Sequence, residues 1–274
     1  HSIFLDTTGN VYSCGNGSYG VLGHGDTTSS KSKPTLILFF VNSSIIISHI
    51  SSGTSFISIF LDVNGYVYSC GHNYYGILGH GDTTDKSTPT LIQTYIGLND
   101  ININYTSITI SKISAGSGHA MFLANTGYVY SCGNGNNGRT GNLPVTDKNT
   151  PTLIQTYIGL NGNNINYTDI TISQVSSGNR HTIFLDTNSN VYSCGANYYG
   201  ELGHGVDTNA SYKPKLVEYF VDNNIIISYI NTKKDHSIFL SNDPYYQTIE
   251  YPAQWTYSDT DASVYHLGNV GIGT

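Results

Sequence analysis

The sequence predicts an all-β protein built from repeats, and three observations support this fold class. The tetrapeptide Tyr-Ser-Cys-Gly occurs four times, and its successive copies are 56, 62 and 62 residues apart, a spacing typical of repeat architectures. The segments before the motif alternate apolar and polar residues, which indicates strands. Only 11% of the residues are charged, while 30 glycines and 23 tyrosines favour tight turns and strands.

The first repeat begins with a predicted hairpin. Residues 1–6 alternate between the two faces of a strand, with Ile3 and Leu5 on the same face. A turn rich in threonine and ending in glycine leads to a second strand, residues 10–14. Five glycines between residues 15 and 25 exclude a helix there and predict a structured loop.

The rest of the first repeat is predicted to be extended. Pro34 opens a third strand, at an edge where the missing N–H of proline is tolerated. The apolar runs 36–41 and 45–47 are short and contain β-branched residues. We expect both runs to be strands that lead into the next repeat.

Later copies keep this frame but depart from it locally. In the second copy, Phe56 or Ser58 stands where the other copies begin with a histidine. In the third copy, Arg139 and Thr140 occupy positions that hold an apolar or acidic residue and a leucine elsewhere, and Asn142 replaces a histidine. Positions where the copies disagree are candidates for function.

The repeats define the domain organisation. A fifth copy starts at residues 235–240 but lacks the Tyr-Ser-Cys-Gly motif. We therefore assign residues 1–240 to the repeat region and residues 241–274, which contain the single tryptophan, to a C-terminal extension or linker.

Two connectors between repeats stand out by their length. Residues 93–111 and 155–173 are nearly identical to each other and longer than the corresponding connector 39–48. Because insertions at one place in each repeat gather on one face of a repeat protein, we expect these connectors on a common face, often the one that binds partners.

The four cysteines occupy the same position in each repeat. Equivalent positions lie a whole repeat apart, so disulfide pairing within the chain is not expected, and zinc-site spacing is absent. We predict that they are small buried residues. Unpaired thiols favour a cytoplasmic location, with a virion or extracellular location as the alternative.

Charge and motifs exclude several function classes. The net charge is -7, with 11 lysines and arginines, which disfavours direct binding to nucleic acid or to an anionic membrane surface. No apolar run is long enough for a membrane helix. The glycine-rich loops lack the lysine of a phosphate loop. No catalytic constellation, cofactor or metal site is predicted, which leaves a protein partner.

The repeat resembles that of the regulator of chromosome condensation family. The frame Gly-x-x-His-x-apolar-x-Leu at residues 116–123, and the block 67–81 followed by Pro89, carry the resemblance, and related copies cover residues 1–240. At the position of Cys14 the family more often has tryptophan. The resemblance implies a β-propeller with about one four-stranded blade per repeat.

Four signatures and a partial fifth predict an incomplete propeller, with further blades before residue 1 in the natural protein. The last seven residues, 268–274, loosely resemble segments of phage and large-virus fibre proteins.

Candidate site residues follow from the repeat. His24, His80 and His204 recur at one loop position, and positions spread around a propeller cannot converge on one metal ion. We therefore expect them to fix the loops through hydrogen bonds. The candidate contact residues are those that break the repeat and the paired loop tyrosines, namely Arg139, Thr140, Asn142, Tyr74, Tyr75, Tyr198 and Tyr199.

The sequence therefore favours a non-enzymatic scaffold whose propeller faces bind a protein partner. Two alternatives stay open. The family resemblance implies guanine-nucleotide exchange on a small GTPase. The C-terminal segment suggests an adhesin or a virion or fibre-associated structural module.

Overall fold

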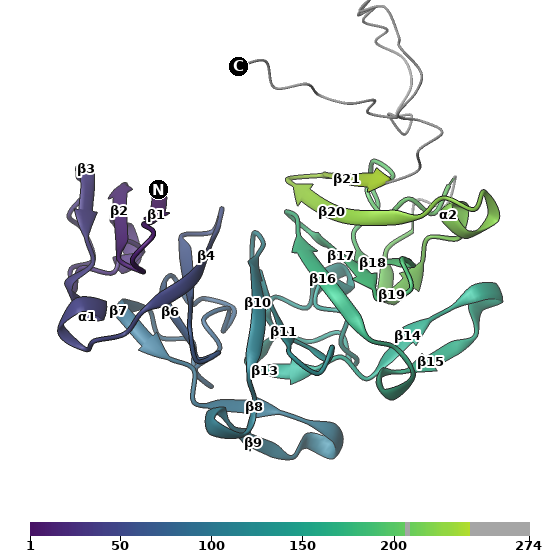
Figure 1. Ribbon diagram of the computed structural model, residues 1–274, viewed down its shortest axis with the longest axis horizontal. Coiled ribbons are helices and arrows are strands. Elements are labelled where there is room, and N and C mark those ends of the chain that lie inside the picture. Colours follow the sequence, from purple (N-terminus) through teal and green to yellow (C-terminus); the bar gives the residue numbers. More distant parts are fainter. Residues whose placement is uncertain (206–208, 242–274) are drawn as a thin grey trace, which may run out of the picture.

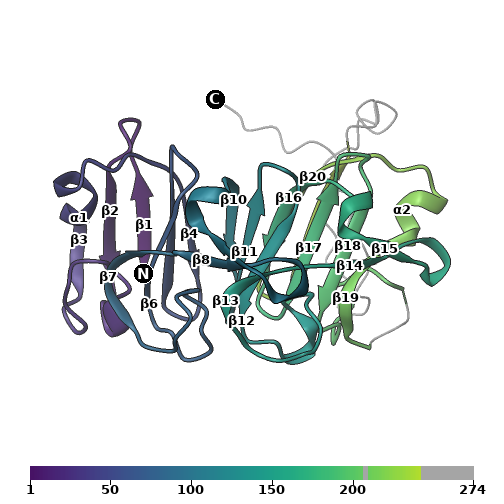
Figure 2. The ribbon, with the colours of Figure 1, turned by 90° about the horizontal axis from the view of Figure 1, so that it is seen from below.

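The computed structural model describes residues 1–205 and 209–241. In these residues the chain forms a succession of sheets that stand side by side along an arc (Figure 1). Figure 2, viewed from below, shows the strands of neighbouring sheets standing next to one another along the long axis of the molecule. The predicted all-β repeat fold is confirmed, with five consecutive sheets that we call blades. The C-terminal extension assigned from the sequence lies outside the described residues, except for Ser241.

The blades follow one plan, in which the chain passes through antiparallel strands in sequence order. The first blade contains β1 (Ser2–Leu5), β2 (Val11–Gly15) and β3 (Lys31–Leu36). The second contains β4 (Ile47–Gly53), β5 (Ile57–Asp62), β6 (Val67–Gly71) and β7 (Lys86–Leu91). The third contains β10 (Ile110–Ala115), β11 (His119–Ala124), β12 (Val129–Gly133) and β13 (Lys148–Leu153). The fourth contains β16 (Ile172–Ser177), β17 (His181–Asp186), β18 (Val191–Gly195) and β19 (Ser211–Leu216), and the fifth contains β20 (Ile227–Lys233) and β21 (His236–Ser241).

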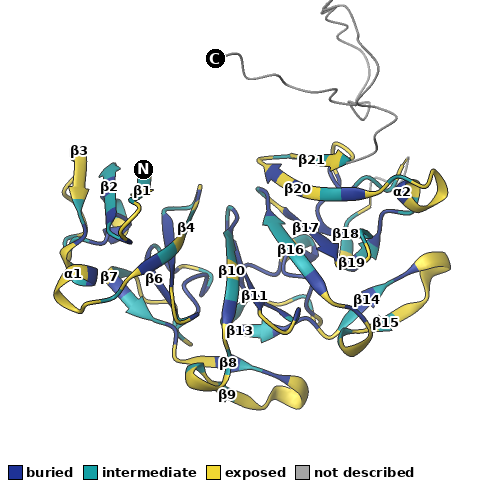
Figure 3. Cartoon of the chain, viewed as in Figure 1, coloured by how far each residue is buried: buried dark blue, intermediate teal, exposed yellow. Residues whose placement is uncertain are grey.

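The core lies between the blades. Strands β4, β10, β16 and β20 line the inner side of the arc (Figure 1). The next two strands of the second, third and fourth blades are buried along their whole length, as Figure 3 shows in dark blue. Four apolar clusters each join one blade to the next. Each blade therefore buries its apolar faces against its neighbours, as in other repeat proteins.

The connectors correct one prediction and show where the long insertions lie. The run 36–41, predicted as a strand, contains most of a short helix, α1 (Leu38–Asn42), and α2 (Glu218–Asp222) lies at the equivalent place before the fifth blade. The long connectors form hairpins, β8 (Thr94–Ile96) with β9 (Asn102–Asn104), and β14 (Thr156–Ile158) with β15 (Asn164–Asn166). These hairpins extend the outer edges of the third and fourth blades through parallel pairing with β13 and β19. Both hairpins lie on the outer rim (Figure 1), so the two connectors share one side of the arc; that this side binds partners stays a prediction.

Both kinds of connector place one aromatic ring at the same position. Phe40 of α1 packs with its ring centre 5.0 Å from Phe60 and 5.9 Å from Tyr68. Tyr95 and Tyr157, from the hairpins, take the same place in the third and fourth blades, and Phe220 of α2 packs on Phe239 in the fifth. Burial of this ring explains why an apolar run follows the third strand, and why its local conformation can be helix or hairpin.

Polar groups cross the blade interfaces at equivalent positions. The Thr182 hydroxyl donates to the carbonyl oxygen of Arg139 in the preceding blade (2.8 Å) and lies 2.8 Å from Nε2 of His119. The same arrangement joins Ser58 to Val21 and His1, and Ser237 to Glu201 and His181. A Cβ at Gly116 would lie 2.4 Å from Cε1 of His119, so the Gly-x-x-His motif makes room for the histidine ring.

The second and third blades use an apolar pair at this interface. Ile57, not Phe56 or Ser58, occupies the histidine position, because it pairs with Gly71 as His119 pairs with Gly133. The hydroxyl position of the third blade is Ala120, and both side chains are fully buried. Losing the histidine and its hydroxyl partner together avoids a buried unpaired polar group.

The cysteines lie at the same interfaces. The Sγ atoms of Cys70, Cys132 and Cys194 face loop carbonyl oxygens of the preceding blade at 3.1–3.8 Å. All three are buried, Cys14 is half-buried, and none forms a disulfide. Burial raises the pKa of the three buried thiols far above the usual range, which makes them unreactive.

Candidate functional site

The glycine-rich loops and the turns between the first two strands of each blade meet at one end of the sheets. We call this surface the loop face; it comprises the loops 16–30, 72–85, 134–147 and 196–205 and the turns 54–56, 116–118 and 178–180. Each loop is held from within. Ser69 of the Tyr-Ser-Cys-Gly motif donates to the carbonyl oxygen of Leu78 and contacts Nε2 of His80 (2.9 Å).

This arrangement recurs for His24 and His204, so the predicted structural role of the loop histidines is confirmed. Asn142 keeps the bond in the third loop, because its side-chain amide donates to Ser131 (2.6 Å) and to the carbonyl oxygen of Thr152.

The predicted contact residues separate into three groups. Thr140 and Asn142 are buried beneath the loop, so neither is placed to contact a partner. Arg139 and Tyr75 line the same pocket. The other tyrosines are on the surface, with Tyr74, Tyr198 and Tyr199 exposed by 67%, 57% and 72%.

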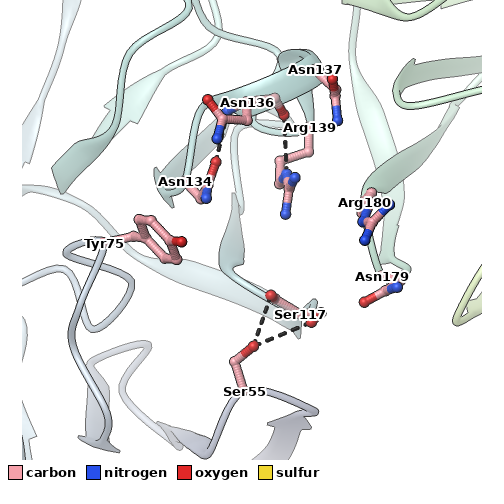
Figure 4. Close-up of a pocket in the computed structure, with 9 residues that line it drawn as sticks. All are labelled: Ser55, Tyr75, Ser117, Asn134, Asn136, Asn137, Arg139, Asn179 and Arg180. Atoms are coloured by element: carbon pink, nitrogen blue, oxygen red, sulfur yellow. Dashed lines mark hydrogen bonds between the residues drawn. The ribbon is translucent and has the colours of Figure 1, made fainter.

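The pocket lies where three successive blades meet on the loop face (Figure 4). Its volume is about 570 Å³. The lining is polar and comes from the turns and loops of the second, third and fourth blades: Ser55, Tyr75, Ser117, Asn134, Asn136, Asn137, Arg139, Asn179 and Arg180. On its floor the Ser55 hydroxyl donates to the backbone oxygen of Ser117 (2.8 Å), which ties the second blade to the third.

Arg139 extends into this pocket from the third loop (Figure 4). Its backbone carbonyl holds the interface with the fourth blade, as Val21 and Ile77 do in their copies. Its Nε donates to the carbonyl oxygen of Asn136 (3.1 Å). The side chain is only 7% exposed. Burial, followed by the positive charge of nearby Arg180, lowers the pKa of Arg139.

Sequence reasoning missed Arg180, whose guanidinium flanks the pocket (Figure 4). It precedes His181 at a position that holds Phe56, Gly118 or Asp235 in the other copies, so it breaks no pattern. Composition carried the usable signal, because Arg139 and Arg180 are the only arginines in the sequence.

A row of aromatic residues leads across the loop face to the pocket. Tyr19 packs against Phe56 and His72, with ring centres 5.5 and 4.3 Å apart. His72 in turn stacks near Tyr74, and Tyr74 meets Tyr75 edge-on at 4.7 Å. We call these five residues the aromatic row. It presents rigid, partly exposed rings beside two cationic groups.

Other site chemistries find little support in the described part of the chain. No group of three or more His, Cys, Asp or Glu residues there could hold a metal ion. None of its helices is long and apolar enough to cross a membrane.

Known proteins with similar sequences share the repeat region. The chain is 33% identical to human E3 ubiquitin-protein ligase HERC2 over 222 residues, which is 80% of this chain and 4% of that protein. It is 31% identical to the ultraviolet-B receptor UVR8 of Arabidopsis thaliana over 244 residues, 89% of this chain and 49% of the receptor. The chain therefore spans at most about half the length of these relatives.

Among solved structures, the chain superposes on Prp20p from Saccharomyces cerevisiae with a TM-score of 0.67 and 21% identity, covering 87% of this chain and 53% of Prp20p. This likeness shows the propeller fold. The sequence model of the regulator of chromosome condensation (RCC1) repeat matches residues 8–59, 64–123, 126–185 and 188–240. The matches cover most of the chain and follow the blade order, and the chain belongs to the RCC1 repeat family.

Proposed function

We propose that the chain is a non-enzymatic protein-binding scaffold whose loop face contacts a macromolecular partner. The observation that carries this proposal is the pairing of the aromatic row with the polar pocket on one surface. Tyrosine and arginine are among the residues that most often dominate protein interfaces, because both offer a large contact area and directed hydrogen bonds, and tyrosine does so at a low entropy cost. Tyr74, Tyr198 and Tyr199 lie in loops of this face and are exposed.

A photo-crosslinking experiment tests the loop face directly. We would place a benzophenone amino acid at Tyr74 in the full-length protein, and at Thr35 as a control, since Thr35 is an exposed residue of the outer strand β3. We expect a partner that crosslinks from position 74 and not from 35. The affinity of the purified partner should then fall at least about tenfold on Tyr74→Ala. Crosslinking from position 35 alone would contradict the proposal.

Guanine-nucleotide exchange on a small GTPase is the second candidate. It rests on the family and on Prp20p, whose binding to Gsp1p and histones has been described. Exchange by a propeller needs no covalent chemistry and would use the same kind of exposed loop surface. Full-length protein should then accelerate release of labelled GDP from at least one member of a GTPase panel. Unchanged release across the panel would remove this candidate and leave the scaffold proposal standing.

The adhesin or fibre alternative depends on residues 242–274, which lie outside the described residues. It stays a prediction, and a trimer of the full-length protein in solution is the result that it requires.

A further inference from the structure

The pocket on the loop face contains both arginines of the sequence. The sequence contains 11 cationic side chains against 18 acidic ones, and only two of the cations are arginines. Both line this pocket, although they are 41 positions apart and come from different blades. The other 9 cations are lysines, and none of them lines it.

The guanidinium of Arg139 has unused hydrogen-bonding capacity. Among the described residues, the Asn136 carbonyl oxygen, which accepts from Nε, is the only hydrogen-bond acceptor for this guanidinium. Gly118 has a positive φ of 151°, and a Cβ there would be 3.5 Å from Nη1, so the glycine leaves open space beside the terminal nitrogens. The terminal Nη groups open onto the pocket, so they are available to a ligand with acceptor oxygens.

No carboxylate of the described residues forms an ion pair with either arginine. The ion pairs found there are Lys31 with Asp26 and Lys86 with Asp82, both remote from the pocket lining. Asp147 attracts the charge of Arg139, but less strongly than Arg180 repels it. Asp147 accepts from the backbone N–H of Gly135 (2.9 Å), and Asp235 accepts from the Asn179 amide (3.2 Å). The two positive charges therefore face each other across an open space, which is an arrangement that an external anion would stabilise.

We propose that this pocket binds the side-chain carboxylate of an aspartate or a glutamate in an acidic protein segment, with Arg139 and Arg180 as its two ligands. The proposal rests on the protein-binding role proposed for the loop face. A carboxylate has two oxygens, and each can accept from one guanidinium. The amides of Asn134, Asn136 and Asn179 can pair with the peptide backbone on either side.

Other anionic ligands fit less well. The third oxygen and second charge of a phosphate group would find no further cation in the lining. Nucleic acid and anionic membranes need an extended basic surface, whereas this chain has a net charge of -7 and two arginines at one point.

Fluorescence anisotropy with labelled octapeptides tests this assignment. The probe peptide contains two aspartates and two glutamates among glycine, serine and tyrosine. A second peptide has asparagine and glutamine at the acidic positions, and a third adds one phosphoserine to that amide version. We expect the acidic peptide to bind at least about tenfold more tightly than the amide version, with an affinity that falls as salt rises.

Variants assign the binding to the pocket. Arg139→Ile installs the residue that stands at the equivalent position 77, so the repeat already accommodates it. Arg180→Gln changes an exposed side chain and should leave the fold intact. Each variant should lower the affinity for the acidic peptide at least about tenfold. Lys33→Gln, which removes one charge from the outer strand β3, should change the affinity for the acidic peptide less than about twofold.

Several results would overturn the proposal. Equal affinity for the acidic and amide peptides would do so, as would wild-type affinity in Arg180→Gln. Tenfold tighter binding of the phosphoserine peptide than of the acidic one would reassign the pocket to phosphorylated segments. If a partner crosslinked at Tyr74 binds both arginine variants unchanged, the carboxylate site fails while the scaffold function stands. If the acidic peptide binds the pocket but nothing crosslinks at Tyr74, the carboxylate site stands while the scaffold function fails.

Discussion

At the scale of single residues, the hydroxyl that crosses each blade interface serves two groups at once. Thr182 donates to the Arg139 carbonyl and contacts His119, and the second and third blades replace such a pair with Ile57 and Ala120. The two members of a pair should therefore be energetically coupled, since removing one leaves the other buried without its partner.

A double-mutant cycle measures this coupling. Thr182→Ala alone should lower the free energy of unfolding by about 1–3 kcal/mol, because it orphans the His119 ring and the Arg139 carbonyl. Combining it with His119→Ile reproduces the apolar pair of the neighbouring interface. We expect the double variant to lose at least about 1 kcal/mol less than the sum of the single losses in urea unfolding. Strictly additive losses would contradict the coupling.

The buried histidines also make stability depend on pH. Burial lowers the pKa of His181 to about 4 and holds the pKa of His119 well below its usual range. The unfolded chain, with histidine pKa values near about 6.5, binds more protons than the folded chain in this window. Stability is therefore complete above about pH 6.5 and is lost as the pH falls towards about 4, by up to about 3 kcal/mol for His181.

Urea unfolding at pH 7.5, 6.0 and 4.5 checks this prediction. The variant His181→Gln can keep a hydrogen bond to Ser237 without titrating, so its stability should vary less over this range than that of the wild type. His49→Gln is the control, because His49 is exposed on β4 and does not act on the pKa of His181. If the free energy of unfolding of His181→Gln changes with pH as much as that of the wild type, other groups cause the pH dependence.

At the scale of elements, the helical connector and the hairpin connector start and end on equivalent backbone hydrogen bonds. The backbone N–H of Ile37 donates to Val11 and that of Ile92 to Val67, and the connectors end on equivalent bonds from Ile47 to Gly9 and from Ile110 to Gly65. Between these anchors only one buried aromatic ring is shared. A helix and a hairpin can therefore satisfy the same attachment.

A chimera tests this interchange. Replacing residues 93–109 with the sequence of residues 38–46 should retain the fold, because Phe40 would supply the ring of Tyr95. It should also uncover the outer edge of β13, which pairs with β8 at Thr152. We expect hydrogen exchange in β13 to accelerate by roughly tenfold or more, with β19 unchanged as the internal control. Unfolding of the whole third blade would show that the hairpin is indispensable.

Elements differ in how far the sequence predicts them. The hairpin of each blade follows from alternation and glycine turns, and the structure confirms it, with Ile3 and Leu5 on the less exposed side of β1. The run 36–41 was assigned the wrong conformation because five or six apolar residues fit a buried strand or a helical turn equally well. Only the packing of Phe40 against Phe60 and Tyr68 decides between them.

The candidate site shows the same limit. Arg139 and Tyr75 could be identified because one breaks the repeat and the other belongs to a tyrosine pair. Comparison of the repeats could not identify Arg180, since its position varies in every copy; only its being one of two arginines singles it out, and its proximity to Arg139 exists only after the third and fourth blades dock. Thr140 and Asn142 break the pattern as well, yet they are buried, so a change in the repeat does not by itself reveal exposure.

At the scale of the whole molecule, the interfaces are unequal. Among the described residues, the clusters that join the second blade to the third and the third to the fourth contain 16 and 11 buried residues, whereas those of the first and last interfaces contain 7 each. In repeat proteins, stability is close to a sum of such neighbour terms. The third blade, which contributes to both large clusters, should be the most stable part.

Native-state hydrogen exchange checks this ordering. Amides of β11 and β12 should exchange only with global unfolding, while those of β1, β2, β20 and β21 should exchange through opening of the first or fifth blade, at least about tenfold faster. The variant Phe40→Ala should widen the difference at the first blade, because it removes a ring that fills the first interface. Identical protection in all blades would show that the described arc unfolds as one unit.

The Ile57–Ala120 pair has a consequence for how such a gene can change. The third blade places an alanine in its interface with the second blade and a histidine in its interface with the fourth blade. Its two interfaces are therefore of different kinds, one apolar and one hydrogen-bonded. Tandem duplication of the coding segment for this blade would set His119 of one copy against Ala120 of the next and bury an unpaired imidazole. Duplicating the fourth blade would set His181 against Thr182, a matched pair. Recombination can therefore add a blade at some junctions without loss of stability, whereas at others the added blade would bury an unpaired polar group, even though the repeats look alike in sequence.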